Sequence, residues 1–66
     1  MMIRSAKIPF AHQLDCAERE VKYRERCYPR WVAEGKMSKA TADAQLAAMK
    51  AIVETLRPLA ESERLF

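Results

Sequence analysis

Apolar residues recur along the first half of the chain in alternating steps of four and three, which is the spacing of heptad a and d positions. This first stripe consists of Phe10, Leu14, Ala17, Val21, Arg24, Tyr28 and Trp31. Arg24 is its one charged member. Pro9, just before the stripe, suits the first turn of a helix, where a missing N–H group costs little. The spacing predicts a helix over about residues 9–34 that keeps one face against a partner.

A second stripe with the same steps follows a short break in the pattern. Gly35 is the expected end of the first helix, with Lys36 beside its C-terminus, and Ser38 is a natural N-cap for the next helix. The second stripe consists of Ala42, Leu46, Met49, Val53, Leu56 and Ala60. It predicts a helix over about residues 38–62, and the many alanines of this segment favour that conformation.

Two long helices joined by so short a turn are expected to lie antiparallel. The sequence therefore predicts an all-α fold, a single helical-hairpin domain over residues 1–66. Ala48, Ile52 and Leu59 flank the second stripe, so its apolar face is wider than one helix can cover. Because a lone core rarely stabilises so small a chain, we expect a four-helix-bundle dimer or a higher closed oligomer. The alternative is a monomeric hairpin.

The prolines and the two chain ends each allow more than one local structure. Pro29 removes the hydrogen bond to the carbonyl of Glu25, so the first helix is expected to kink or to split there. Pro58 is expected to kink or end the second helix. Residues 1–8 and 62–66 are expected to be flexible or to dock on another subunit of the oligomer.

Composition excludes several classes of protein. The sequence contains no apolar run of the ~20 residues that a membrane span needs, and its N-terminus lacks the apolar core of a secretory signal. Cys16 and Cys27 are too far apart on one straight helix to form a disulfide, and no Cys/His cluster suggests a metal site. These features predict a cytoplasmic protein without a metal ion or cofactor.

A charged pair lies inside the apolar arc of the first helix. Glu20 and Arg24 are four residues apart with the acid first, the favoured order for a helical ion pair. One interpretation is a buried pair that sets the register between helices. The other is a ligand site at a subunit interface, where the arginine holds an anion and aromatic rings stack on a base. The candidate ligand-binding residues are Glu20, Tyr23, Arg24, Tyr28, Arg30 and Trp31.

A long segment resembles a known group of proteins. Its residues are YPRWVAEGKMSKATADAQLAAMKAIVETL, from Tyr28 to Leu56. With Glu18, Glu20 and Arg24 before it, the segment resembles a group of short uncharacterised phage and prophage proteins. The resemblance implies a phage setting and action inside an infected bacterial host. Small phage proteins are often counter-defence factors, and some are helical oligomers that sequester nucleotide signals between subunits.

Three functions follow as predictions. The first is a phage-type binding protein that sequesters a nucleotide-derived signal in an Arg/aromatic pocket between subunits. The second is an inhibitor or adaptor that binds a host protein through its helical faces, since the apolar surface exceeds what the hairpin needs. The third is a nucleic-acid accessory protein, because the net charge of +3 is concentrated in residues 1–36. No nucleophile–base set or phosphate loop is evident, so we expect no enzymatic activity.

Overall fold

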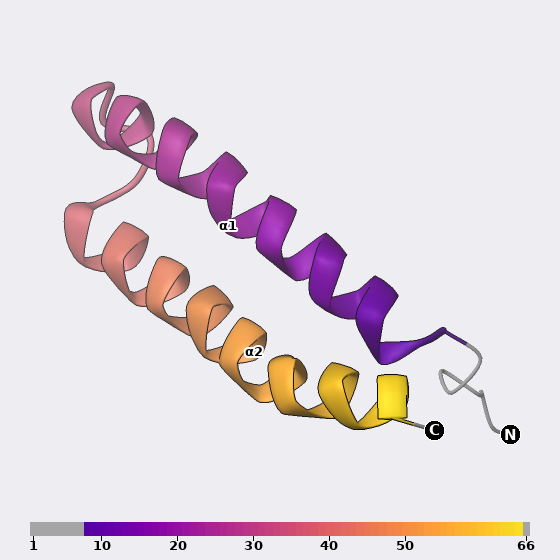
Figure 1. Ribbon diagram of the computed structural model, residues 1–66. Coiled ribbons are helices and arrows are strands. Elements are labelled where there is room, and N and C mark those ends of the chain that lie inside the picture. The colour runs from indigo at the N-terminus through magenta and orange to yellow at the C-terminus, as the bar shows by residue number, and fades with distance from the viewer. Residues whose placement is uncertain (1–7, 66) are drawn as a thin grey trace, which may run out of the picture.

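The computed structural model describes residues 8–65, which form two antiparallel α-helices joined by a tight turn (Figure 1). Helix α1 spans Phe10–Ala33 and helix α2 spans Lys39–Leu65. The predicted all-α hairpin is therefore confirmed for the described part of the chain. The first helix begins one residue later and ends one residue earlier than predicted, which is within the usual fraying of helix ends.

Gly35 ends α1, as the sequence predicts. Its φ angle is +77°, in the left-handed region where a side chain is strained. Its N–H group donates to the carbonyl of Val32 at 3.0 Å, and the N–H of Lys36 donates to the carbonyl of Trp31 at 2.9 Å. These two bonds are those of a Schellman motif, and they satisfy carbonyls that have no partner within the helix.

Ser38 caps the start of α2, as the sequence also predicts. Its hydroxyl oxygen accepts a hydrogen bond from the N–H group of Thr41 at 3.1 Å. This bond satisfies one of the unpaired donors of the first helical turn. Gly35 and Ser38 together therefore fix the turn that makes the helices antiparallel.

The start of α1 is capped from the other end of the chain. Pro9 precedes the helix and offers no side-chain hydrogen bond. Instead, the carboxylate of Glu63 in α2 accepts hydrogen bonds from the N–H groups of Phe10 at 2.8 Å and Ala11 at 3.0 Å. The negative charge also lies at the positive end of the α1 dipole. The side chain of Glu63 thus connects the two helices at the open end of the hairpin, where no turn joins them.

Neither internal proline interrupts its helix. Helix α1 continues through Pro29 and α2 continues through Pro58. The expectation that Pro58 ends α2, and the predicted end near residue 62, are therefore wrong. The turns beyond Pro58 are held by the burial of Ala60 against α1 and by the bonds of Glu63. Residues 62–65 are helical, while residues 1–7 and 66, also expected to be flexible or docked, lie outside the described residues.

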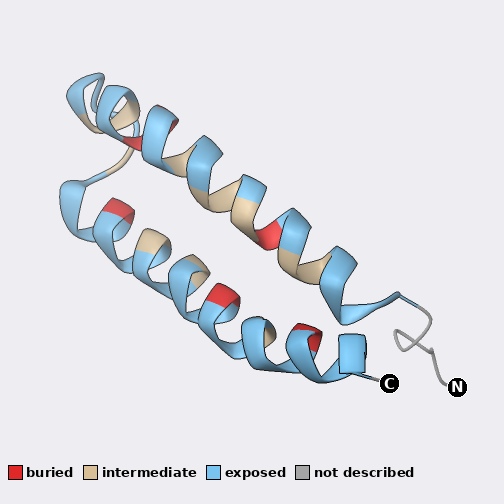
Figure 2. Cartoon of the chain, viewed as in Figure 1, coloured by how far each residue is buried: buried red, intermediate tan, exposed pale blue. Residues whose placement is uncertain are grey.

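The contact between the helices is narrow, and Figure 2 shows only a few buried positions on each helix. Their side chains are mainly small. The buried residues are Ala17, Cys27, Tyr28, Ala42, Val53 and Ala60. The second stripe is confirmed throughout, since its remaining members Leu46, Met49 and Leu56 are half-buried. In the first stripe Phe10 is the exception, because it is 38 % exposed. No described side chain is completely shielded from solvent, so the hairpin has a shallow core.

Replacing Glu63 by Ala is expected to lower the free energy of unfolding by about 1 kcal/mol, because two N–H groups at the start of α1 lose their acceptor. Urea unfolding followed by circular dichroism, at one fixed protein concentration, measures the loss. Glu61→Ala is the control, because Glu61 is exposed and pairs only with Arg64. Equal losses in the two variants would show that Glu63 has no capping function.

Gly35→Ala is expected to destabilise the protein by about 1–2 kcal/mol, because an L side chain is strained at positive φ. The space around Gly35 is open, so no steric clash adds to the effect. Gly35→Asn separates the two causes, since asparagine tolerates this backbone region better than alanine does. The same unfolding experiment should place Gly35→Asn between the wild type and Gly35→Ala.

Candidate functional site

The narrow contact between α1 and α2 leaves two long sides of the hairpin, and one of them is charged. We call this surface the charged side; its residues are Glu18, Lys22 and Glu25 of α1 and Lys50, Glu54 and Arg57 of α2. Two ion pairs cross between the helices here, Glu25 with Lys50 at 3.4 Å and Glu18 with Arg57 at 3.3 Å. Arg57 also reaches Glu54 at 3.5 Å. These pairs fix which residues of the two helices lie level.

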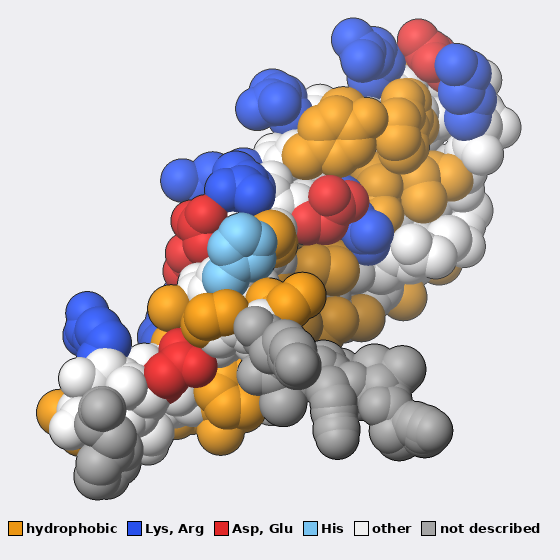
Figure 3. All heavy atoms as spheres, turned by 90° about the vertical axis from the view of Figure 1, so that its right-hand side faces the viewer, with side chains coloured by type: hydrophobic (Ala, Val, Ile, Leu, Met, Phe, Trp, Pro, Cys, Tyr) orange, Lys and Arg blue, Asp and Glu red, His pale blue; other side chains and the backbone are white. Residues whose placement is uncertain are grey.

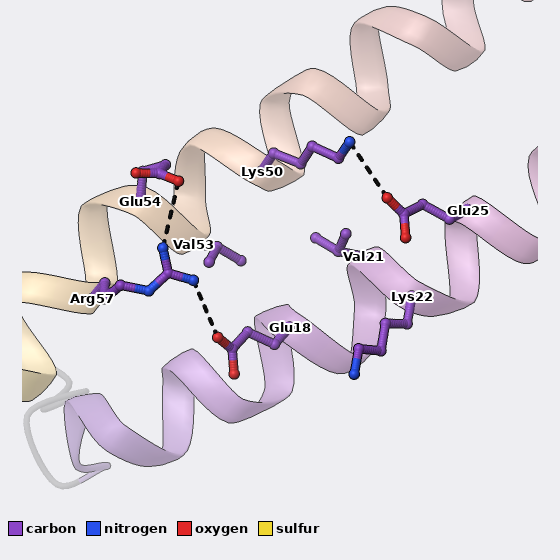
Figure 4. A pocket seen from close by; sticks show the side chains of 8 residues that line it. All are labelled: Glu18, Val21, Lys22, Glu25, Lys50, Val53, Glu54 and Arg57. Atoms are coloured by element: carbon purple, nitrogen blue, oxygen red, sulfur yellow. Dashed lines mark hydrogen bonds and ion pairs between the residues drawn. The ribbon is translucent and has the colours of Figure 1, made fainter.

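A shallow groove of about 370 Å³ runs along the charged side. Figure 4 shows Val21 and Val53 pointing toward each other between the helices, with an interhelical ion pair to either side of them. Acidic and basic groups alternate around the groove, so it offers no field of one sign to a charged ligand. Exposed pairs of this kind contribute little to stability. We interpret the charged side as a solvated edge of the hairpin contact.

The opposite side of the hairpin is apolar. We call it the apolar band; its residues are Phe10, Tyr23 and Trp31 of α1 and Met49, Ile52, Leu56 and Leu59 of α2. The α2 members are three or four residues apart and so share one face of the helix. Phe10 and Leu59 line a common hollow, which shows that both helices contribute to this side. Figure 3 shows hydrophobic side chains gathered along one side of the molecule, interrupted by acidic and basic groups.

Large side chains in the apolar band remain substantially exposed. The exposed fractions are 45 % for Tyr23, 45 % for Ile52, 40 % for Leu59 and 38 % for Phe10. Single exposed apolar residues are normal on a protein surface, but an aligned group of them marks an interaction site. Ile8 and Leu65 are also exposed, yet Leu65 falls on another face of α2.

Glu20 and Arg24 lie within this band. The Nε of Arg24 donates to Oε1 of Glu20 at 2.8 Å. The side chains are 26 % exposed for Arg24 and 43 % for Glu20, so the pair is half-buried. The guanidinium carbon lies 6.0 Å from the ring centroid of Tyr28, at the outer limit of a cation–π contact. Among residues 8–65, the two Nη groups of Arg24 make no hydrogen bond within 3.5 Å, although Tyr28 is near enough to contribute weakly to the raised pKa of Arg24.

Two shifted pKa values belong to this region. The hydrogen bond to Glu20 raises the pKa of Arg24 above its already high ordinary value. The side chain of Cys27, followed by the charge of Glu20 at longer range, raises the pKa of Tyr23. Arg24 therefore stays charged and Tyr23 stays a neutral hydrogen-bonding phenol near neutral pH. Neither group is suited to exchange protons under those conditions.

The aromatic rings of α1 form a cluster beside this pair. The ring centroids of Tyr28 and Trp31 are 5.7 Å apart, and those of Tyr23 and Trp31 are 6.4 Å apart in an edge-to-face arrangement. Tyr28 is buried, and its hydroxyl donates to Gln45 of α2 at 3.4 Å. Within one chain, the ring of Tyr28 therefore packs against α2 and is not open for stacking on a ligand.

The structure brings together five of the six predicted site residues. Arg30 is the one left apart: it is exposed, and helical periodicity directs it away from Arg24. Neither the 370 Å³ groove nor the hollow of about 290 Å³ beside Tyr28 and Pro29 is lined by Arg24 or Trp31. A ligand pocket at these residues would need walls from a second molecule.

Sequence reasoning identified the α1 members of the site but missed that the band continues across α2. Ile52 and Leu59 were recognised as surplus apolar residues flanking the second stripe, without a position relative to Arg24. The alignment of the two helices along their length is marked by pairs such as Glu18 with Arg57, which are 39 residues apart in sequence. No local pattern reports such a pair.

Other site types find no support in the described part of the chain. Residues 8–65 contain no group of three or more His, Cys, Asp or Glu side chains that could hold a metal ion. Neither α1 nor α2 is both long and apolar enough to cross a bilayer. Comparisons with protein-family models, with curated proteins and with solved structures gave no match. The similarity to phage proteins therefore stays a prediction, and function must be inferred from the geometry.

Proposed function

We propose that this chain is a non-enzymatic binding protein that works as a homodimer, with two hairpins packed band to band in a four-helix bundle. The observation that supports the proposal is the apolar band, where large side chains from both helices line up and stay exposed. Two-fold symmetry lets one such surface serve both subunits. A binding role of this kind fits the phage counter-defence setting predicted from the sequence.

Burial of the exposed area would contribute substantially to association and offset part of the entropy that association costs. Fully burying a large apolar side chain contributes about 1.5–3 kcal/mol, and the four most exposed members of the band still have roughly two-fifths of that to gain. Their burial then contributes on the order of 1 kcal/mol each. The half-buried Met49 and Leu56 add further contact area. The shallow core of a single hairpin makes this added burial important for stability.

Band-to-band packing leaves the charged side exposed. It lies on the opposite edge of each hairpin, so it faces outward on both subunits of the proposed dimer. Most of its charges are paired within each chain, so this side offers no particular support for the predicted inhibitor or adaptor that binds a host protein through its helical faces. The apolar band would serve that function only if a host protein replaced the second subunit.

Ile52→Glu is expected to convert the dimer to a monomer at tens of micromolar protein, because a carboxylate would enter the centre of the apolar contact. Sedimentation velocity measures the association state. Leu65→Glu is the matched control, since Leu65 is more exposed, at 77 %, but lies on another face of α2. A monomeric wild type, or a dimer that Ile52→Glu leaves intact, would refute the proposed assembly.

A second candidate function is the predicted binding of a nucleotide-derived signal. The observation that favours it is the guanidinium of Arg24, whose two Nη groups make no hydrogen bond within 3.5 Å among residues 8–65 and lie beside an aromatic cluster. Arginine uses such paired donors to hold a phosphate in a bidentate contact. The walls of the pocket would come from the second subunit, as the sequence predicts.

Calorimetric titration with cyclic dinucleotides and with ADP-ribose tests this candidate. Saturable binding should weaken at least about tenfold in Arg24→Ala, which is the loss expected for one charge-assisted contact, at a protein concentration where sedimentation velocity shows that the variant is still dimeric. Arg30→Ala is the control, because it removes an exposed arginine that lies outside the cluster. No saturable heat with the wild type, or equal losses in the two variants, would count against a nucleotide site at Arg24.

The third predicted function, nucleic-acid binding, has the least support. A duplex-binding surface presents basic side chains to the phosphates without interleaved acids. Here Lys50 and Arg57 are each paired with an acid of α1, and Arg19 is paired with Asp15 at 2.6 Å. Lys22, Arg26 and Arg30 of the basic half are exposed and form no ion pair among residues 8–65, so the basic charge without an acid beside it is limited to a few side chains on the outer face of α1.

A further inference from the structure

The Glu20–Arg24 pair has more hydrogen-bonding capacity than a single chain uses. Nε of Arg24 bonds to Oε1 of Glu20, while the Nη groups and the second carboxylate oxygen make no hydrogen bond within 3.5 Å among residues 8–65, apart from a weaker influence of Tyr28 on the guanidinium. In an open band these atoms are solvated. When a second molecule covers the band they lose water, and buried charged groups without partners are strongly destabilising. Whatever covers the band must therefore offer hydrogen-bond acceptors to the guanidinium and a donor to the carboxylate, and an acid and a base make the strongest such contacts.

We propose that a second copy of this chain supplies both groups, through reciprocal ion pairs between Glu20 of each subunit and Arg24 of the partner subunit. The inference rests on the proposed dimer and deepens it by placing its two-fold axis. In a two-fold interface, if residue i meets residue j, then j also meets i. An axis at the level of Lys22, midway between the two charges, brings each acid opposite the partner subunit's base.

The dimensions of helices allow this contact. Four residues correspond to about 6 Å of rise, so each charge lies about 3 Å along the helix from an axis at Lys22. Packed helices are about 8–10 Å apart, a gap that a glutamate and an arginine can span together. The Nη groups left free by the intrachain bond are those at the end of the Arg24 side chain, which reach farthest toward a partner.

The surroundings of the axis are apolar, which makes the pairing selective. The interhelical pairs Glu18–Arg57 and Glu25–Lys50 place Ile52 of α2 level with the stretch between Glu20 and Arg24. Ile52 is 45 % exposed there and would seal the ion pairs from water on contact. A partner helix without matching charges would strand them, so the pair fixes both the register and the identity of the partner.

Two charge-reversal variants test the inference. Arg24→Glu puts two acids in the band and Glu20→Arg puts two bases there, so either variant alone should self-associate at least about tenfold more weakly than the wild type. An equimolar mixture should recover a dimer, with one copy of each variant by native mass spectrometry. Neither chain in the mixture has its intrachain pair, so recovery can come only from contacts between subunits.

The double variant Glu20→Arg/Arg24→Glu controls for folding, because it keeps one acid and one base in each chain and should dimerise like the wild type. Circular dichroism of each variant checks helix content. A dimeric double variant beside a mixture that stays monomeric would overturn the reciprocal pair, while the response to Ile52→Glu would still support the dimer. If Arg24→Ala keeps wild-type dimer affinity, the guanidinium does not bridge the subunits and the inference also fails. A monomeric wild type would refute the dimer itself.

Discussion

The closeness of α1 and α2 is the constraint on which the rest of the structure depends. Small side chains such as Ala17, Ala42 and Ala60 occupy most of the buried contact. They let the helix backbones approach, but they leave little space between the helices for large side chains. Phe10, Tyr23, Ile52 and Leu59 are therefore displaced to the edge of the contact and stay exposed. The same feature that stabilises the hairpin thus produces its apolar band.

The two long sides of the hairpin differ in what covers the edge of the contact between the helices. On the charged side, Glu25–Lys50 and Glu18–Arg57 bridge the helices over a narrow apolar floor, so that side is complete in a single chain (Figure 4). Such exposed pairs contribute only a few tenths of a kcal/mol to about 1 kcal/mol each, and they act mainly on register. The apolar band has no comparable cover among residues 8–65. This asymmetry, more than the total amount of apolar surface, is the reason for placing the proposed second subunit on the apolar band.

Much of the fold could be predicted from the sequence because it follows from local rules. Heptad spacing placed both helices and the whole second stripe, and the Gly35 and Ser38 signals depend on backbone chemistry within a few residues. The contribution of Glu63 could not be predicted, because its contact with Phe10 joins residues 53 apart in sequence. That unforeseen contact, together with the burial of Ala60, holds the turns beyond Pro58 against α1, although a proline removes one hydrogen bond of the helix.

The candidate site was predictable to the same extent and for the same reason. Five of its six residues are gathered because steps of three and four connect them along one side of α1, whereas Arg30 falls about 120° around the helix from Arg24. The aromatic side chains could not be assigned a role from spacing alone. Tyr28 packs against Gln45 of α2, which depends on how the two helices are aligned. A helical-wheel projection of one helix shows which residues share a face. It does not show which other element packs on that face.

The energetic meaning of the Glu20–Arg24 pair depends on that cover. As a half-exposed pair on a single hairpin it contributes little to stability, because water competes for every donor and acceptor. Once the band is closed, an unmatched charge at the same place would cost several kcal/mol, comparable to the gain from burying the surrounding apolar side chains. Apolar area alone would favour many partners. The Glu20–Arg24 pair restricts the choice of partner, because burial of the band is favourable only if the partner satisfies both charges. A second copy of the chain carries the matching acid and base by symmetry.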